Sequence, residues 1–252
     1  MPNMSAAAVA LITGGLSDIG RATAEAFARR GFAVVVNYRH SPEKAAALAE
    51  FLRREAGAPG ALAVQADVRR RTNVVALFDR AIESFGRVDV LVNNAGVNRD
   101  RPIMDMSEDE WETVVSTILN GAFWCSQEFA RRYVGSGGCI VNIGALTALK
   151  GRKNGANYCS ARAGVLALTK CLALELAPNI RVNTVTPGRI DTEELRTRYH
   201  LEQAENQQRL KADIPLGQFG RPSDVASMIV FVATSPYLTG QNFIVDGGLY
   251  MC

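Results

Sequence analysis

Short apolar runs alternate with longer amphipathic stretches along all 252 residues. The apolar runs are rich in β-branched residues and nearly continuous, which is typical of strands buried on both faces of a sheet. The longer stretches repeat their apolar positions with a helical period, and clear examples cover residues 19–30, 42–55 and 74–85. We predict seven strands, at residues 9–13, 33–37, 61–66, 90–93, 139–143, 181–186 and 243–245.

The alternation of strand and helix predicts an α/β fold: a doubly wound parallel sheet of about seven strands with helices on both faces. Folds of this kind are often undivided at this length, so we expect one domain over residues 1–252. The sequence "SEDE" at 107–110 has the capping-box pattern and predicts the start of a further helix.

A polar run at residues 193–211, "EELRTRYHLEQAENQQRLK", interrupts the alternation late in the chain. We expect it to form a helical insert, over 193–220, above the carboxyl edge of the sheet, where ligands bind in such folds. Two interpretations fit this run equally well. It is either a mobile lid over a substrate or a plain pair of solvated helices.

Composition and charge mainly exclude classes of protein. Apolar residues make up 48% and charged residues 21%, the balance of an ordinary globular domain. The net charge of +3 is too small to indicate nucleic acid or an acidic membrane, and the run "AAAVALI" is too short to span a bilayer. Five isolated cysteines and two histidines lack the spacing of a zinc site. We therefore expect a cytoplasmic protein with no metal, membrane or nucleic-acid partner.

A glycine-rich segment, "TGGLSDIGRA" at 13–22, follows the first predicted strand directly. Glycines between a strand and a helix let the backbone approach a pyrophosphate, which the amino end of the helix then holds. Further signals follow later strands: "ADV" at 66–68, "NNAG" at 93–96 and "PGRIDT" at 187–192. These segments together predict a dinucleotide site at the carboxyl edge of the sheet.

Together with Tyr158, these segments resemble the short-chain dehydrogenase/reductase family over the entire chain. The segments "NAGVNRD", "IPLGQFGRPSDVA" and "LTGQNFIVDGGLYM" look most like its 3-oxoacyl-carrier-protein reductases. The resemblance implies a single Rossmann-type domain that transfers hydride between a nicotinamide cofactor and a C=O or CH–OH group. It also implies a small-molecule or acyl-thioester substrate.

The resemblance further implies which residues hold the cofactor. The pyrophosphate is assigned to Gly14, Ser17, Asp18, Ile19 and Gly20, and the adenine to Asp67 and Val68. The ribose and the adjoining sheet edge are assigned to Asn93, Ala95 and Gly96. The nicotinamide is assigned to Pro187, Gly188, Ile190 and Thr192.

The end of the second strand bears on the choice of cofactor. Its sequence "NYRH" has no acid to accept hydrogen bonds from a ribose 2′-hydroxyl. Arg39 could instead pair with a 2′-phosphate, which favours NADP(H) over NAD(H). A solvated arginine is the alternative interpretation.

Position 18 departs from the family pattern, which places a glycine where this chain has Asp18. A carboxylate beside a pyrophosphate is repulsive, and desolvation increases the repulsion. Asp18 could alternatively cap its own helix and occupy amides that a phosphate needs, or turn its side chain toward solvent. The first two alternatives weaken cofactor binding, and the third leaves it intact.

The catalytic centre departs from the family at three of four polar positions. In the family a tyrosine donates a proton to the substrate oxygen, and a lysine four residues later stabilises the phenolate. A serine binds the substrate oxygen, and an asparagine anchors a relay water. Tyr158 matches the tyrosine, but Arg162 stands at the lysine position. Ala145 replaces the serine and Ile118 replaces the asparagine, while nearby Asn120 points around the helix.

These replacements leave two interpretations open. Arg162 keeps a permanent positive charge, although its planar fork does not readily pass on a proton. Loss of an oxyanion-type donor at Ala145 typically costs about 10²–10³ in rate, unless Thr147 supplies a hydroxyl. The chain is then either an NADP(H)-linked oxidoreductase with a rearranged centre, or a non-catalytic scaffold that binds a ligand or an active relative.

The run "ARAGVLALTKCLALEL" is apolar around more of its circumference than one core-facing stripe requires. In the family this helix, the preceding helix and the "VDGG" end form a tetramer interface. The resemblance therefore implies a homotetramer or homodimer.

Overall fold

Seven strands form one parallel sheet in the order β3-β2-β1-β4-β5-β6-β7. The computed structural model describes residues 7–135 and 137–251. The strands are β1 (Val9–Ile12), β2 (Ala33–Tyr38), β3 (Ala61–Gln65), β4 (Val90–Asn93), β5 (Gly138–Ile143), β6 (Ile180–Pro187) and β7 (Asn242–Val245). All seven predicted strands are confirmed, each to within one residue at either end.

The direction in which strands are added reverses at β1. The chain proceeds from β1 outward to β3, then crosses back and adds β4 to β7 on the other side of β1. At such a reversal the loops leave the carboxyl ends of β1 and β4 toward opposite faces and open a crevice between them. The topology therefore places a ligand crevice at the glycine-rich segment after β1.

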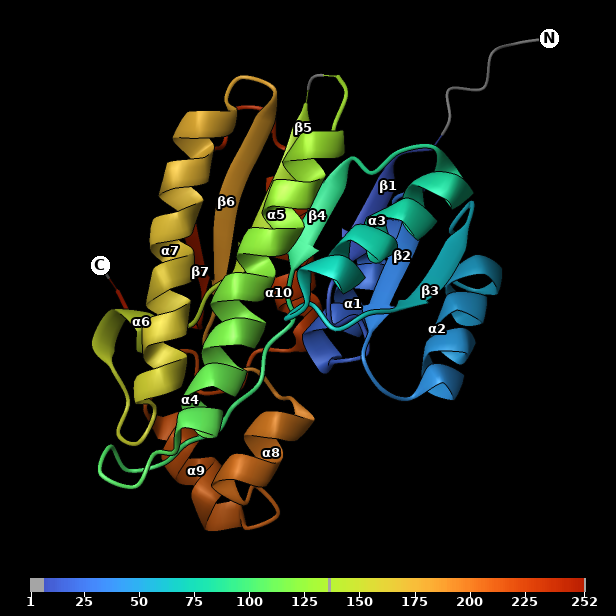
Figure 1. Cartoon of the computed structure of the whole chain (residues 1–252). Coiled ribbons are helices and arrows are strands. Elements are labelled where there is room, and N and C mark those ends of the chain that lie inside the picture. The colour runs from blue at the N-terminus through green and yellow to red at the C-terminus, as the bar shows by residue number, and fades with distance from the viewer. Residues whose placement is uncertain (1–6, 136, 252) are drawn as a thin grey trace, which may run out of the picture.

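Helices cover both faces of the sheet, as predicted (Figure 1). One face carries α1 (Asp18–Ala28), α2 (Pro42–Arg54) and α10 (Pro222–Thr234), and the other carries α3 (Arg71–Phe85), α5 (Gly121–Arg132) and α7 (Ala156–Leu176). Two predicted boundaries need correction. Helix α1 ends two residues early, and α3 begins three residues before its first predicted position.

The helix that approaches the crevice, α4 (Glu108–Val115), begins with the predicted capping box. The Ser107 hydroxyl accepts a hydrogen bond from the Glu110 amide at 3.2 Å, and the Glu110 carboxylate accepts one from the Ser107 amide at 3.0 Å. The Ser107 amide, with help from Arg101, holds the pKa of the Glu110 carboxyl down at about 2. The cap therefore stays intact over all but strongly acidic conditions.

A π-helical turn, η1 (Ser116–Asn120), joins α4 to α5 and was not predicted from the sequence. The amide of Gly121 reaches back to the carbonyl of Ser116, five residues earlier, as well as to that of Ile118. Such turns insert one extra residue into a helix and are frequent at functional sites. Here the turn bends the helix next to Ile118.

Residues 193–211 form two helices, α8 (Glu193–Tyr199) and α9 (Ala204–Ala212). Figure 1 shows them beyond the carboxyl ends of the strands, below α4. A short helix, α6 (Thr147–Lys150), lies in the connection between β5 and α7. No helix within residues 7–135 and 137–251 is long and apolar enough to cross a membrane.

Candidate active site

A cavity of about 640 Å³ lies at the carboxyl edge of the sheet. Its walls come from the glycine turn after β1, the segments after β4, β5 and β6, the first turns of α7, and α8. Most predicted site residues line it, namely Gly14, Ser17, Asp18, Ile19, Ala95, Gly96, Ala145, Tyr158, Arg162, Pro187, Gly188, Ile190 and Thr192. The fold thus gathers residues from five separate parts of the sequence around one space.

Two predicted residues lie behind the cavity wall. A Cβ on Gly20 would stand 2.5 Å from the carbonyl oxygen of Gly14, so only glycine permits this close turn. The Asn93 amide donates to the Ser126 hydroxyl at 3.0 Å and to the Asn142 side chain at 2.8 Å. Asn93 is therefore part of the sheet edge, and its side chain does not face the cavity.

Asn94 holds the glycine turn against β4 and was missed in the sequence. Its side-chain nitrogen donates to the carbonyls of Thr13 and Gly14, both at 2.9 Å, and to the Ser17 hydroxyl at 3.1 Å. Gly14 adopts a φ of +60°, which glycine tolerates best. The second asparagine of "NNAG" was the available signal, because a polar residue at the end of a central strand needs a partner.

The first turn of α1 presents free amides to the cavity. Ser17 is the N-cap and its hydroxyl accepts from the Gly20 amide at 3.2 Å. The expectation that Asp18 could cap this helix is therefore wrong. The amides of Asp18 and Ile19 donate to no protein acceptor in the described part of the chain. Free amides at a helix amino end are the donors that a pyrophosphate requires.

The Asp18 carboxylate is exposed and contacts α8. Its Oδ2 accepts a hydrogen bond from the backbone amide of Glu193 at 2.8 Å. That amide belongs to the first residue of α8, where the helix dipole favours a negative charge. Asp18 thus ties the glycine turn to α8.

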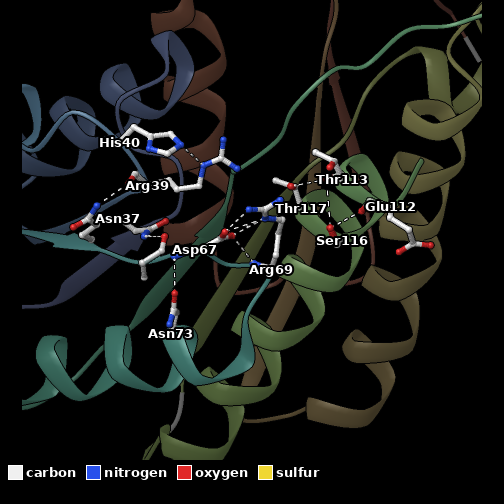
Figure 2. A network of polar contacts seen from close by, with 12 residues as sticks. Asn37, Arg39, His40, Asp67, Arg69, Asn73, Glu112, Thr113, Ser116 and Thr117 are labelled. Carbon is white, nitrogen blue, oxygen red and sulfur yellow. Dashed lines mark hydrogen bonds and ion pairs between the residues drawn. The ribbon is translucent and has the colours of Figure 1, made fainter. Parts of the chain in front are cut away.

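A charged pair lies at the ends of β2 and β3, outside the cavity. The Arg69 guanidinium binds both carboxylate oxygens of Asp67 and lowers the pKa of Asp67. Arg39 is exposed and donates to the His40 ring at 2.8 Å. Figure 2 shows the Arg39 guanidinium beside the Asp67–Arg69 pair. Val68 is buried, so its backbone, not its side chain, is available on this side.

Tyr158 and Arg162 come together on the first turns of α7. The Arg162 guanidinium carbon lies 5.3 Å from the centre of the Tyr158 ring. Arg162 is 6% exposed, and its Nη1 donates to the carbonyl of Ile143 at the end of β5. A Cβ on Gly96 would lie 2.5 Å from Arg162 Nη2, so the small residue after β4 makes room for the guanidinium. The Tyr158 hydroxyl bonds no protein group within the described residues.

Comparison with known proteins decides the family. The family described as "Enoyl-(Acyl carrier protein) reductase" matches residues 14–250. The chain is 40% identical over 251 residues to a 3-oxoacyl-[acyl-carrier-protein] reductase of Synechocystis sp., covering 97% of this chain and 98% of that protein. The chain belongs to the short-chain dehydrogenase/reductase family.

Other relatives of this short-chain dehydrogenase/reductase are similarly close. An L-rhamnose 1-dehydrogenase (NAD(P)(+)) of Azotobacter vinelandii is 39% identical over 96% of both chains. A crystal structure from Brucella melitensis, described as a short-chain dehydrogenase/reductase and glucose/ribitol dehydrogenase, superposes with a TM-score of 0.89. It is 30% identical, and the match covers 97% of each chain.

The remaining two tetrad positions of this short-chain dehydrogenase/reductase carry apolar side chains. Ala145 lines the cavity and offers no hydroxyl. Ile118, in the π-helical turn, is 2% exposed and packs in an apolar cluster with Ala161 and Val165, against which the Tyr158 ring lies. Thr147 also lines the cavity, but its hydroxyl is buried and has no hydrogen-bond partner in the described residues. The tyrosine ring therefore contacts apolar side chains of this cluster together with the guanidinium of Arg162.

A polar cluster borders the same cavity. Its basic loop, "TALKGRKNGAN" at 147–157, is compatible in the sequence with an anionic or carrier-bound substrate or with a solvated loop, but Arg152 was not predicted as a site residue. Arg152 lies over the Tyr158 ring, with its guanidinium carbon 4.8 Å from the ring centre. Its Nη2 donates to Asn98 at 3.1 Å and to Asp100. Arg198 on α8 pairs with the same Asp100 at 3.0 Å. The basic loop around residue 152 was a visible signal, but its partners are far away in sequence.

We predict that Arg162 destabilises the fold. It is a buried cation with no carboxylate partner in the described part of the chain, and such burial is unfavourable. Arg162→Met should therefore raise the free energy of unfolding by about 1 kcal/mol or more, as measured by urea denaturation.

Arg181→Met is the matched control. The Arg181 guanidinium satisfies the carbonyls of Val232, Leu238 and Ala233, so its removal leaves acceptors unpaired and should lower stability. A loss of stability in Arg162→Met as large as that in Arg181→Met would show that Arg162 is retained for the fold.

Proposed function

We propose that this protein is an NADP(H)-dependent oxidoreductase with a rearranged catalytic centre, in which Tyr158 is the proton donor and Arg162 its cationic partner. The observation that carries the proposal is the Arg162 guanidinium lying 5.3 Å from the Tyr158 ring inside the cavity. A free tyrosine has a pKa of about 10, so a proton-donating tyrosine needs a fixed positive charge near its phenolate. Arg162 is the buried cation beside it.

The residues around the cavity fit a nicotinamide dinucleotide. The free amides of Asp18 and Ile19 suit the pyrophosphate, and Gly14 and Gly96 leave space for close approach of the backbone. Ile190 and Thr192 line the same cavity, where the family resemblance assigns them to the nicotinamide. Bound there, the cofactor supplies or accepts the hydride. Because the exposed Asp18 carboxylate is engaged with α8, it leaves these amides open.

The choice of NADP(H) rests on the charges at the ends of β2 and β3. Arg39 follows β2, where an NAD-selective site needs an acid, and its positive charge also lowers the pKa of Asp67. Arg69 neutralises the Asp67 carboxylate, which would otherwise repel a 2′-phosphate. The adenosine end of the site therefore has an excess of positive charge.

In the proposed reaction Tyr158 gives its proton to the substrate oxygen as hydride reaches the carbonyl carbon, and an alcohol forms. Arg162, fixed by Ile143, stabilises the phenolate that remains. Because Ile118 replaces the asparagine that anchors a relay water in the family, Tyr158 regains its proton from water that enters the cavity after the product leaves. Slow turnover follows, because the oxyanion donor is missing at Ala145.

The substrate class suggested by relatives is an acyl thioester, since two of them are named 3-oxoacyl-[acyl-carrier-protein] reductases. A second candidate function is a non-catalytic scaffold. The apolar side chains at Ala145 and Ile118 favour it, because they remove two of the polar groups that the family uses on the substrate and the relay water.

We also propose a homotetramer or homodimer. On α7, Leu174 is 83% exposed although the helix is apolar, and α7 lies beside α4 and α5 on one face (Figure 1). Four exposed residues of α7 repeat at helical spacing and form an apolar stripe, which favours contact with a second copy; they are Ala163, Ala167, Cys171 and Leu174.

Cofactor selectivity gives the first test. Arg39→Ala should weaken NADPH binding at least tenfold and leave NADH binding nearly unchanged, because only NADPH carries the phosphate that Arg39 pairs with. Nicotinamide fluorescence measures both dissociation constants. Arg70→Ala, which removes an exposed arginine at the start of α3, is the control. Equal losses for both cofactors in Arg39→Ala would contradict the assignment.

Catalysis gives the second test, on a panel of ketones, alcohols and one 3-oxoacyl thioester. Tyr158→Phe and Arg162→Ala should each abolish the slow wild-type turnover. The triple change Ile118→Asn, Ala145→Ser and Arg162→Lys should raise thioester reduction by at least about 10², the scale of one recovered oxyanion donor.

Two outcomes would overturn parts of this account. A wild type that turns over nothing on the panel while the triple variant works would support the scaffold function. A wild type that reduces the thioester at roughly 10 per second, a median enzyme rate, would falsify the claim that the centre is impaired.

Assembly gives the third test. Light scattering at micromolar concentration should report a dimer or tetramer mass, and Leu174→Glu should shift it toward the monomer because a charge cannot be buried unpaired. A monomeric wild type would contradict the proposed assembly.

A further inference from the structure

Positive side chains crowd the cavity. Five cationic side chains line it and only two carboxylates do; these are Lys150, Arg152, Arg162, Arg189 and Arg198, with Asp18 and Glu194. Arg189 is neutralised by Asp213 at 2.8 Å, and Asp18 belongs to the cofactor side. The half of the cavity around Tyr158 therefore keeps an excess of positive charge.

Arg152 is the best placed of these cations. It is fixed, because it lies over the Tyr158 ring and its Nη2 is held by Asn98 and Asp100. Its side chain is only 17% exposed. Its Nε is buried without a hydrogen-bond partner, and its Nη1 bonds no acceptor in the described residues. A guanidinium offers five N–H donors. Nη2 uses its two on Asn98 and Asp100 and Nε is buried, so the two N–H donors of Nη1 are left for a ligand.

The carboxylates nearby balance the charge of Arg152 and Arg198, but they leave Nη1 of Arg152 without an acceptor. Asp100 is shared, with one oxygen facing Arg152 and the other facing Arg198. Glu194 pairs with Arg198 at 2.8 Å and also accepts from Asn98 at 3.2 Å. These contacts orient the guanidinium groups, and they leave Lys150 and Arg162 without a carboxylate partner within residues 7–135 and 137–251.

We propose that the substrate carries an anionic oxygen group, a carboxylate or a phosphate, close to its reacting carbon, and that Arg152 is the residue that binds it. This inference rests on the proposed function, which places the reacting carbon at the Tyr158 hydroxyl. Because Arg152 is stacked on the same tyrosine ring, the anionic group and the carbonyl must be separated by only a few bonds. The substrate is then a small oxo acid or oxo phosphate, and it differs from a neutral carrier-bound thioester.

Two matched pairs of compounds test this proposal: acetoacetate with methyl acetoacetate, and dihydroxyacetone phosphate with dihydroxyacetone. Within each pair only the anionic group differs. Calorimetry with the NADP⁺-saturated protein and with the protein alone measures binding without requiring turnover. In at least one pair the anion should bind at least tenfold more tightly, and the pair that discriminates identifies carboxylate or phosphate.

Arg152→Gln should remove this preference, lowering the affinity for the anion about tenfold and leaving its neutral partner unchanged. Arg209→Gln, an exposed arginine on α9, makes the same change in net charge and should have no effect. The proposal is overturned if the neutral compounds bind as tightly as the anions, if none of the four binds at millimolar concentration, or if both variants lose affinity equally.

These outcomes are distinct from failure of the proposed function. If the protein prefers the anion through Arg152 but binds no cofactor and shows no turnover, the anion site is established and the proposed oxidoreductase function is refuted. Turnover that depends on Tyr158, with no preference between charged and neutral partners, would do the reverse.

Discussion

The side-chain amide of Asn94 joins the two halves of the sheet at the point where a ligand must bind. It donates to the glycine turn after β1 from the end of β4, and these strands are neighbours only because the strand order reverses there. The same turn is also held from β2, because the Gly15 amide donates to the Asn37 carbonyl at 2.8 Å and the Gly14 amide donates to the Asn37 side chain at 3.2 Å. Loops gain order from such contacts. The free amides of α1, the cavity and the approach to Tyr158 all take their positions from this turn.

The fold could be predicted because its signals are local. Seven buried strands are visible as apolar runs, and the Ser107–Glu110 cap needs only four consecutive residues. The substitutions at Arg162, Ala145 and Ile118 were also visible, because spacing from Tyr158 fixes each position. The contacts between distant segments around the cavity were not visible in the sequence. Arg152 meets Asn98 and Asp100, and Asp100 also pairs with Arg198 on α8. Asp18 meets an amide 175 residues away. No pattern along the chain encodes such pairs.

Arg162 and Ile118 make most sense together. Both lie beside Gly96, and both would meet a side chain placed there. In the family, the lysine, the asparagine and a water form a hydrated proton relay. Here Arg162 lies beside the apolar side chain of Ile118 and donates directly to the Ile143 carbonyl. The observed pair is therefore internally consistent as packing, which random loss of single polar groups would not favour. Ile118 lies within the π-helical turn between α4 and α5.

The hydrogen bond between Asp18 and the Glu193 amide connects α8 directly to the glycine turn. The Asp18 carboxylate lies between the amino end of α1, whose amides suit a phosphate, and the amino end of α8, which borders the cavity. If a bound phosphate weakens this bond by repelling the carboxylate, α8 opens more easily in the loaded protein. Thermodynamic linkage then requires the converse: a ligand that draws α8 shut releases the phosphate side by the same factor. The cofactor and the ligand under α8 would then weaken each other's binding. The two products would leave faster, and the second molecule to enter would bind less tightly.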